Sequence, residues 1–281
     1  MDFKRIQWIF LIVFIGINIF LGIEIIQIPT LLSSNTTTTS GDNLQQEMAA
    51  DNIKIPHVSN KESDGYYLAA KVDKTWINKA QSQVGDQMTV TTSSTESSVS
   101  ATLNNPVAIS SDKKKAIKDL NNFKNNAKNV YKGDEYVYSP ELSENNDYIF
   151  LQKTPYGLIY STRARLHITV KDNKIVSYYQ RYTDKVSTVR ERQTTISAKE
   201  AINSLYTYSE LPNNSKVIWI KYGYTKLTQV RGSVIFLPSW LVAIENNTSK
   251  TVTVKRVNAF TSTIIQPQTT SEEKNDDEVK D

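Results

Sequence analysis

The chain has 281 residues, a formal net charge of +4 at neutral pH and no cysteine. The lack of cysteine excludes a disulfide framework, a cysteine nucleophile and lipoprotein processing, and it argues against a structural zinc site. Glycine is scarce, with 9 residues, and neither G-x-x-x-x-G-K nor G-x-G-x-x-G occurs, which argues against a nucleotide-binding loop.

The first predicted element is a long apolar helix near the N-terminus. No charged residue occurs between Arg5 and Glu24, a stretch of 18 residues. As a helix it rises about 27 Å, close to the ~30 Å hydrocarbon core of a bilayer, so we expect a single transmembrane helix over residues 6–28. The stretch is longer than the core of a secretory signal and no A-x-A pattern follows it, so we favour an uncleaved anchor over a cleaved signal peptide. Lys4 and Arg5 precede the helix, and the positive-inside rule therefore places the tail 1–5 in the cytoplasm and the residues after the helix outside the cell membrane.

Four positions of this helix are candidate contacts with a partner helix. Asn18 places a polar side chain near the bilayer centre, and Gly22 follows one turn later on nearly the same face. Gly16 falls near the opposite face, and Glu24 is expected near the outer interface. The alternative explanation, that glycine is simply frequent in membrane helices, stays open.

A Ser/Thr-rich linker is expected after the helix, over residues 29–52. A flexible linker of this length has a root-mean-square span of about 25 Å. Such a tether transmits little torque, so we expect the helix to act on a partner through side-to-side contact rather than as a rigid lever.

The first part of the exported region alternates between strand and helix patterns. We expect a strand over 65–72, a short helix over 76–84 and a hairpin or mobile loop over the β-branched stretch 89–101. A clearer amphipathic helix follows, with Ser110 or Ser111 as its cap. Its predicted apolar face consists of Ala116, Leu120, Phe123, Ala127 and Val130.

The second part of the exported region has a more regular pattern. A hairpin turn is expected at residues 171–174, and Ser197 and Glu200 form an S-x-x-E capping box at the start of a helix that ends before Pro212. The expected strands are 147–153, 158–170, 174–182, 185–192, 216–227, 234–245 and 251–260.

This order of strands, a helix and further strands predicts an α+β fold, with helices packed across antiparallel sheet. A looser version of the same order in the first part suggests two tandem related subdomains. The expected division is a cytoplasmic tail (1–5), a transmembrane helix (6–28), a linker (29–52), two extracytoplasmic α+β subdomains (53–140 and 141–266) and a disordered acidic tail (267–281).

Charge is distributed unevenly along the chain. The acidic tail from Ser271 has a net charge of −4, which leaves +8 on the rest. A basic exported body can bind anionic lipid headgroups or an anionic wall polymer, but a scattered, solvated surface explains the same charge equally well. Nucleic acid is not an expected partner in this compartment.

No catalytic or metal-binding motif is recognisable in the sequence. His57 and His167 lack H-E-x-x-H spacing, and no G-x-S-x-G elbow occurs, so we expect both histidines to be structural or surface residues. Glu135, Glu141 and Glu144 are candidate carboxylates for glycoside cleavage, but they fall in a polar stretch typical of a solvated loop. We therefore expect no enzymatic activity, no metal and no cofactor.

Several stretches of the sequence together resemble one known family. They are MDFKRIQWIFLIVFIGINIFLG, GYYLAAKV, DYIFLQK, VSYYQRY, VRERQTTISAKEAINSLY, KYGYTKL, LPSWLVAI and VNAFTSTI. In these stretches the chain is similar to the YycI (WalI) family, membrane regulatory proteins of low-GC Gram-positive bacteria. The resemblance covers the chain except for the linker, residues 89–101 and the acidic tail. The order of capping-box helix, P-x-W strand and VNAFTS also resembles the small PepSY-type module.

The resemblance implies a non-enzymatic regulator of the WalK (YycG) sensor histidine kinase, in the two-component system that controls cell-wall metabolism. It implies action through contacts of the membrane helix, together with the companion membrane protein YycH, and it brings no catalytic residue.

A second hypothesis comes from the aromatic residues of the later strands. In it the exported sheet binds a wall fragment, a peptide or a protease, as a PepSY-like sensing or inhibitory module. Trp219, Tyr222, Tyr224 and Trp240 would line that site, although core packing explains these residues equally well. A wall hydrolase is the third class, and we expect no such activity.

Overall fold

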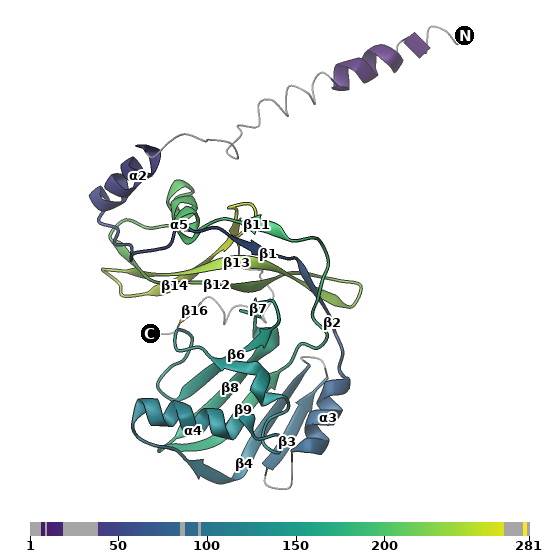
Figure 1. Cartoon of the computed structure of the whole chain (residues 1–281), viewed down its shortest axis with the longest axis vertical. Coiled ribbons are helices and arrows are strands. Elements are labelled where there is room, and N and C mark those ends of the chain that lie inside the picture. The colour runs from purple at the N-terminus through teal and green to yellow at the C-terminus, as the bar shows by residue number, and fades with distance from the viewer. Residues whose placement is uncertain are drawn as a thin grey trace. The chain divides into compact units, whose positions relative to one another are not determined.

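The computed structural model describes residues 7–8, 10–18, 39–84, 88–94, 97–266 and 278–279 (Figure 1). The chain divides into two compact units, Met1–Gln46 and Glu47–Asp281.

The first unit contains an apolar helix at the N-terminus. Its described residues are helical, and their side chains are exposed, with Trp8 66% and Phe10 76% accessible. Helix α2 (Thr39–Ala50) begins in this unit and lies in the predicted linker. No helix among the described residues is both long and apolar enough to cross a membrane. Of the predicted transmembrane helix, residues 6, 9 and 19–28 lie outside the described part of the chain.

The second unit is built on two antiparallel sheets, which we name after their central strands. The β13 sheet has the order β10 (Ser187–Thr188), β2 (Leu68–Lys71), β13 (Ser233–Asn246), β14 (Val252–Asn258) and β15 (Ile264–Ile265), with β12 (Ser215–Val230) beside β13 and β16 (Glu278–Val279) beside β14. The β9 sheet has the order β3 (Met88–Ser93), β4 (Ser98–Ala108), β9 (Lys174–Arg181), β8 (Arg165–Lys171), β6 (Asp147–Thr154) and β5 (Tyr136–Tyr138), with β7 (Gly157–Leu158) beside β6. A separate pair joins β1 (Ser63–Gly65) to β11 (Gln193–Thr195). The α+β class with antiparallel sheets is thus confirmed.

Helices cover one face of each sheet. Helices α3 (Thr75–Gln83) and α4 (Lys113–Asn125) bury Trp76, Leu120 and Phe123 in one core with apolar residues of the β9 sheet. Helix α5 (Ala198–Thr207) buries Ala201, Ile202 and Leu205 and lies on the side of the β13 sheet away from the β9 sheet (Figure 1). Each of these three amphipathic helices therefore buries its apolar face against a sheet of its own unit.

Strand β6 is buried on both faces, and this joins the two sheets. Phe150 belongs to the core under α3 and α4, whereas its neighbours Ile149 and Leu151 belong to a second core with Leu241 and Ala243 of β13. Because successive side chains of a strand point to opposite faces, the continuous apolar run of β6 serves two cores at once.

The strands do not group into the two consecutive segments 53–140 and 141–266 that the sequence predicts. Strand β2 pairs with β13, while β4, which follows it in the chain, pairs with β9. The chain therefore passes from the β13 sheet to the β9 sheet and back again. Pairings between strands this far apart are set by tertiary packing, which a local pattern of residues does not reveal.

Two local predictions with strong turn and cap chemistry are confirmed. The Ser197 hydroxyl accepts from the backbone N–H of Glu200 at 3.2 Å, and the Glu200 carboxylate accepts from the backbone N–H of Ser197 at 2.7 Å, which completes the capping box of α5. In the turn between β8 and β9, Asp172 and Asn173 both have positive φ, 50° and 55°, as a two-residue hairpin turn requires.

The predicted cap and end of α4 were wrong. Asp112 caps the helix, because its carboxylate accepts from the backbone N–H of Lys115 at 3.0 Å. Ser110 lies outside the helix and accepts from the backbone N–H of Asp112 instead. The helix ends at Asn125, so Ala127 lies beyond it. Val130 is buried, but it belongs to the loop that follows the helix.

Two predicted strands are shorter than expected. Residues 158–170 divide into β7, a 3-10 turn (Thr162–Ala164) and β8. Within 185–192, only β10 is a strand. The residues before it connect the two sheets, and the residues after it lead to β11. Of the predicted acidic tail 267–281, only β16 is described.

The two sheets meet where the chain leaves β7 and crosses β12. The backbone N–H of Tyr160 donates to the carbonyl of Tyr224 at 2.8 Å, next to a parallel bridge between Ile159 and Tyr224. The Tyr160 ring lies directly on Gly223, where an added Cβ would approach the ring to 2.3 Å and the carbonyl oxygen of Leu158 to 3.0 Å. The ring is held in place at its far end, since its hydroxyl donates to Glu141 at 2.9 Å. Glycine at position 223 therefore permits the close approach of the two sheets.

This contact predicts the effect of adding one methyl group. Gly223→Ala should lower the free energy of unfolding by about 1–3 kcal/mol, the usual cost of overpacking a close contact. Urea denaturation followed by tryptophan fluorescence measures this change. In a Tyr160→Ala background the same substitution should cost much less, because the ring is gone. An equal cost in both backgrounds would contradict the contact.

Candidate functional site

The predicted contact residues of the N-terminal helix are described only in part. The Asn18 amide donates to the carbonyl of Phe14 one turn earlier, at 2.8 Å. Gly16 has no atom within 4 Å of an added Cβ, so its side of the helix is open to a close neighbour. Gly22 and Glu24 lie outside the described residues. A role in partner contact stays a prediction for all four positions.

The residues considered for chemistry are engaged in separate local contacts. Glu135 accepts from the hydroxyl of Tyr182, and Glu141 from the hydroxyl of Tyr160. His167 Nδ1 lies 3.1 Å from a carboxylate oxygen of Asp147 on the neighbouring strand. In the described part of the chain, no group of three or more His, Cys, Asp or Glu side chains is arranged to hold a metal ion.

The aromatic residues proposed for a ligand site mostly serve packing. Tyr224 is 1% exposed and lies in the core with Leu68 and Phe236. Tyr222 packs edge-on against Trp240 with ring centroids 5.2 Å apart, and the Trp240 indole donates to the carbonyl of Ile196 at 2.9 Å. These contacts support the core-packing explanation for the strand aromatics.

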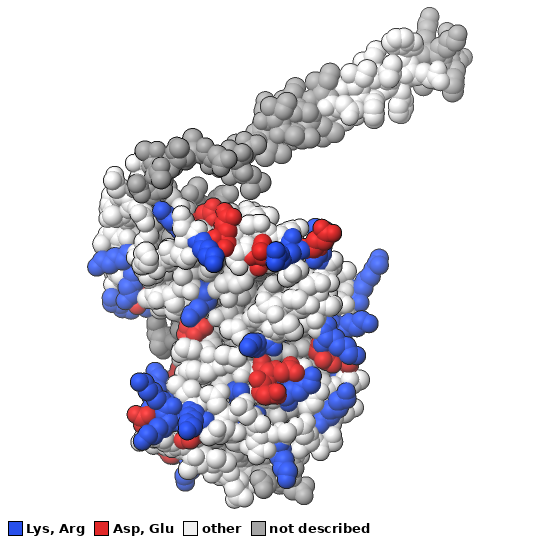
Figure 2. Space-filling model, in the orientation of Figure 1, with Lys and Arg blue, Asp and Glu red and all other residues white. Residues whose placement is uncertain are grey.

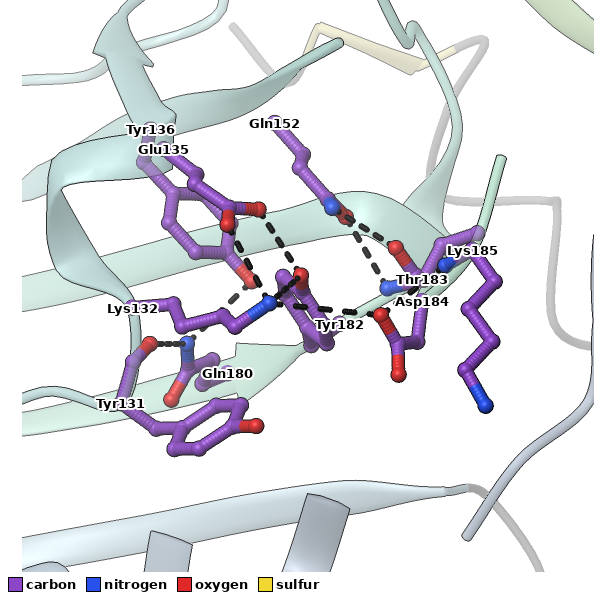
Figure 3. A network of polar contacts seen from close by, with 10 residues as sticks. All are labelled: Tyr131, Lys132, Glu135, Tyr136, Gln152, Gln180, Tyr182, Thr183, Asp184 and Lys185. Carbon is purple, nitrogen blue, oxygen red and sulfur yellow. Dashed lines mark hydrogen bonds and ion pairs between the residues drawn. The ribbon is translucent and has the colours of Figure 1, made fainter. Parts of the chain in front are cut away.

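The structure shows a different candidate site, a groove at the end of β6 beside the segment that leaves β9 (Figure 3). It has a volume of about 500 Å³. We call it the polar groove, and its walls include Lys132, Glu135, Gln152, Lys153, Tyr182, Asp184 and Lys185.

A compact charge network forms one wall of the polar groove (Figure 3). The Lys132 ammonium donates to the Tyr182 hydroxyl at 2.8 Å and lies 3.3 Å from the Glu135 carboxylate. The Tyr182 hydroxyl in turn donates to Glu135 at 2.8 Å. Asp184 completes the network at 4.0 Å from the ammonium. Burial, and the hydrogen bond to Glu135, raise the pKa of Tyr182, so its hydroxyl stays protonated and continues to donate.

The loop that carries the network is held by a buried amide. The Gln180 side chain donates to the carbonyl of Tyr131 at 2.6 Å and to the hydroxyl of Tyr136 at 3.2 Å. This fixes both ends of the short 3-10 turn η1 (Gly133–Glu135). Lys132, just before the turn, has φ of 45°, a left-handed conformation that is uncommon outside glycine and is stabilised here by its contacts.

A second buried amide holds the opposite wall. Gln152 Nε2 donates to the carbonyl of Thr183 at 2.7 Å, and Gln152 Oε1 accepts from the backbone N–H of Thr183 at 2.9 Å (Figure 3). The side chain thus pairs with the backbone in the way a neighbouring strand would. It fixes the start of the segment 182–186, which leads from β9 to β10 and so from one sheet to the other.

The polar groove presents a charge network in one wall and exposed charges at its rim. Its ionisable groups neutralise one another, and none of the polar groups described in it pairs a nucleophile with a general base. The ammonium groups of Lys153 and Lys185 and the carboxylate of Asp134 add exposed charges of both signs. Only Glu135 among the residues of the polar groove is singled out by the sequence, because they come from three separate segments and match no motif.

Comparison with known proteins identifies the family. The family model described as "YycI protein" matches residues 32–260. The chain belongs to the YycI family.

The solved structures that align with this YycI-family chain have low sequence identity to it and TM-scores below 0.5. An uncharacterized protein from Eubacterium rectale has 12% identity and a TM-score of 0.46, over 78% of this chain and 92% of that chain. YycH from Bacillus subtilis has 10% identity and a TM-score of 0.45, over 73% and 54%. The YpeB C-terminal domain from Bacillus megaterium has 10% identity and a TM-score of 0.36, over 82% and 96%. No curated protein matches the chain significantly.

The buried amide of Gln152 gives a second testable prediction. Gln152→Met keeps a similar volume but leaves the buried N–H and C=O of Thr183 without partners, so the free energy of unfolding should fall by about 2–4 kcal/mol. Lys153→Met, at the exposed neighbouring position, is the matched control and should change stability by less than about 0.5 kcal/mol. Urea denaturation of both variants measures the difference. Equal stabilities would contradict the pairing between Gln152 and Thr183.

Proposed function

We propose that this YycI-family chain is a non-enzymatic, membrane-anchored regulator of the WalK (YycG) sensor histidine kinase. It acts together with a YycH-type membrane protein in the control of cell-wall homeostasis. The observation that carries the proposal is the family match over residues 32–260, which includes nearly all of the region predicted to be exported. The chain crosses the cell membrane once, with its N-terminus in the cytoplasm and residues after the helix outside.

The N-terminal helix is the working part of this proposal. Its described apolar side chains are exposed, including Phe14 at 64% and Ile17 at 51%, and such a surface is stable only against lipid or another helix. Asn18 uses one amide proton within its own helix, and its amide oxygen has no partner among the described residues. That oxygen is available to a donor on a neighbouring helix, while Gly16 and Gly22 permit close approach. From its place in the sequence, we expect Glu24 at the outer interface, within reach of lipid headgroups or a partner's basic residue.

The energy required for regulation is small. A tenfold shift between two signalling states of a kinase takes about 1.4 kcal/mol of differential contact. One hydrogen bond between membrane helices supplies about 0.6–2 kcal/mol. The contacts of Asn18 and Gly22 are therefore sufficient in magnitude to bias the kinase.

Substitution of these two positions tests the proposal. Asn18→Leu with Gly22→Leu should weaken co-purification of the chain with the kinase from membranes by about tenfold or more, and kinase output should change in parallel. Ile12→Leu with Ile17→Leu is the matched control, because it keeps the helix apolar and leaves the proposed contacts intact. Unchanged association and unchanged kinase output in the first variant would contradict regulation through these contacts.

The polar groove favours a second candidate function, in which the exported domain senses a ligand. Its volume of about 500 Å³ falls in the range of small-molecule sites, and its mixed charges suit a wall peptide with both ammonium and carboxylate groups.

Thermal denaturation tests this second function. Wall-derived peptides should raise the melting temperature of the full chain by a few degrees, and Lys153→Glu with Lys185→Glu should abolish the shift. The control Lys61→Glu with Lys221→Glu changes the same charge away from the groove and should keep it. The absence of any peptide-dependent shift in the wild-type chain would contradict ligand sensing by the polar groove.

A further inference from the structure

A dense group of lysines lies where α4 begins and where β8 turns into β9. All six are exposed. We call them the lysine patch: Lys113, Lys114, Lys115, Lys118, Lys171 and Lys174. Figure 2 shows basic side chains gathered over this end of α4.

Backbone contacts bring the two parts of the lysine patch together. Lys174 stands opposite Ala108 in the register of β4 and β9. The backbone N–H of Ile109 donates to the carbonyl of Asn173 at 2.9 Å. The chain enters α4 four residues after Ile109, so the first turn of the helix and the hairpin turn project from the same end of the β9 sheet.

The six lysines outnumber the acids beside them, so the patch keeps a net positive charge. None of its six ammonium groups forms an ion pair within the described part of the chain. Two neighbouring carboxylates bind backbone instead, since Asp112 accepts from the N–H of Lys115 and Asp119 accepts from the N–H of Ser110 at 2.9 Å. Asp172, exposed in the hairpin turn, is the remaining acid close to the patch in sequence.

Four of these lysines also destabilise α4, the helix that carries them. Lys113, Lys114 and Lys115 occupy the first turn of α4, where the helix dipole favours negative charge. Lys118 follows at a spacing of four from Lys114 and three from Lys115, where like charges repel. Helix stability alone would therefore favour acids at these positions, and a bound anion would relieve the unfavourable field.

We propose that the lysine patch docks the exported domain on anionic phospholipid headgroups of the membrane that anchors the chain. The proposal rests on the membrane anchoring in the proposed function. An anchored domain stays close to headgroups at high effective concentration, so a weak electrostatic contact suffices.

The chemistry of the patch favours lipid over a soluble polyanion. Every basic residue in it is lysine, a flexible point charge without the fixed geometry that arginine offers to a single phosphate. A helix end and a hairpin turn are both projecting elements, which suit a broad charged surface. The polar groove, by contrast, lies at the opposite end of β9, where the chain continues past Arg181 beside Gln152.

The absence of cysteine from the chain allows a direct test. The full chain with Ser111→Cys, labelled with a donor dye beside the patch, is reconstituted in vesicles that carry an acceptor on their headgroups. Energy transfer should be higher in vesicles that contain phosphatidylglycerol than in phosphatidylcholine alone, and high salt should remove the difference. A label at Gln229→Cys, on β12, should show a smaller dependence on lipid charge.

Charge variants provide the matched comparison. Replacement of Lys113, Lys114, Lys115 and Lys118 by Gln should abolish the effect of phosphatidylglycerol, because each lysine near an anionic surface contributes roughly fivefold to binding. The control replaces Lys54, Lys61, Lys74 and Lys221 by Gln, which removes the same charge from exposed positions outside the lysine patch and the polar groove, and it should keep the effect. Gln is a good helix former, so both variants should retain the wild-type melting temperature.

Three outcomes would overturn the proposal. They are equal energy transfer in neutral and anionic vesicles, equal effects of the two charge variants, and a patch-dependent response of the label to soluble polyphosphate without a response to anionic vesicles. Flotation of the chain with neutral vesicles reports anchoring separately. A failure of the lysine patch is therefore distinguishable from a failure of the membrane anchor.

Discussion

The architecture of the second unit depends on the junction between its two sheets. Strand β6 contributes Phe150 to the core under the helices and Ile149 and Leu151 to the core against β13. After β7, the backbone of Tyr160 forms a hydrogen bond with Tyr224 of β12. The Tyr160 ring lies on Gly223 without an intervening side chain. Without this close approach the inner faces of both sheets would expose apolar surface to water, so the two sheets form one packed body rather than two independent subdomains.

The same junction positions the polar groove. The segment 182–186 is the return path from the β9 sheet to the β13 sheet, and the Gln152 amide fixes its start. A ligand in the groove would contact the segment that joins the sheets. The membrane helix remains the element through which we propose that the chain acts on its kinase.

Local chemistry in the sequence predicted local structure well. The capping box of Ser197 and Glu200 and the turn at 171–174 are contacts between residues within three positions of each other, and both were confirmed. The family resemblance was confirmed by the match over residues 32–260. The interleaving of the sheets and the polar groove were missed, because they depend on contacts such as that of Gln152 with Thr183, 31 residues apart. Polar side chains that bind backbone in this way leave no periodic pattern.

We propose that the N-terminal helix carries the regulatory contact, and exchange of the domain that follows it separates the two parts of the chain. Residues 1–52 are fused to an unrelated exported domain of similar size and expressed in cells that lack the native chain. Kinase output is then measured from a promoter under its control. If the helix carries the contact, the fusion should restore regulation to near the native level. Loss of regulation, with the fusion present in the membrane at native abundance, would contradict the claim and would assign the function to the exported domain.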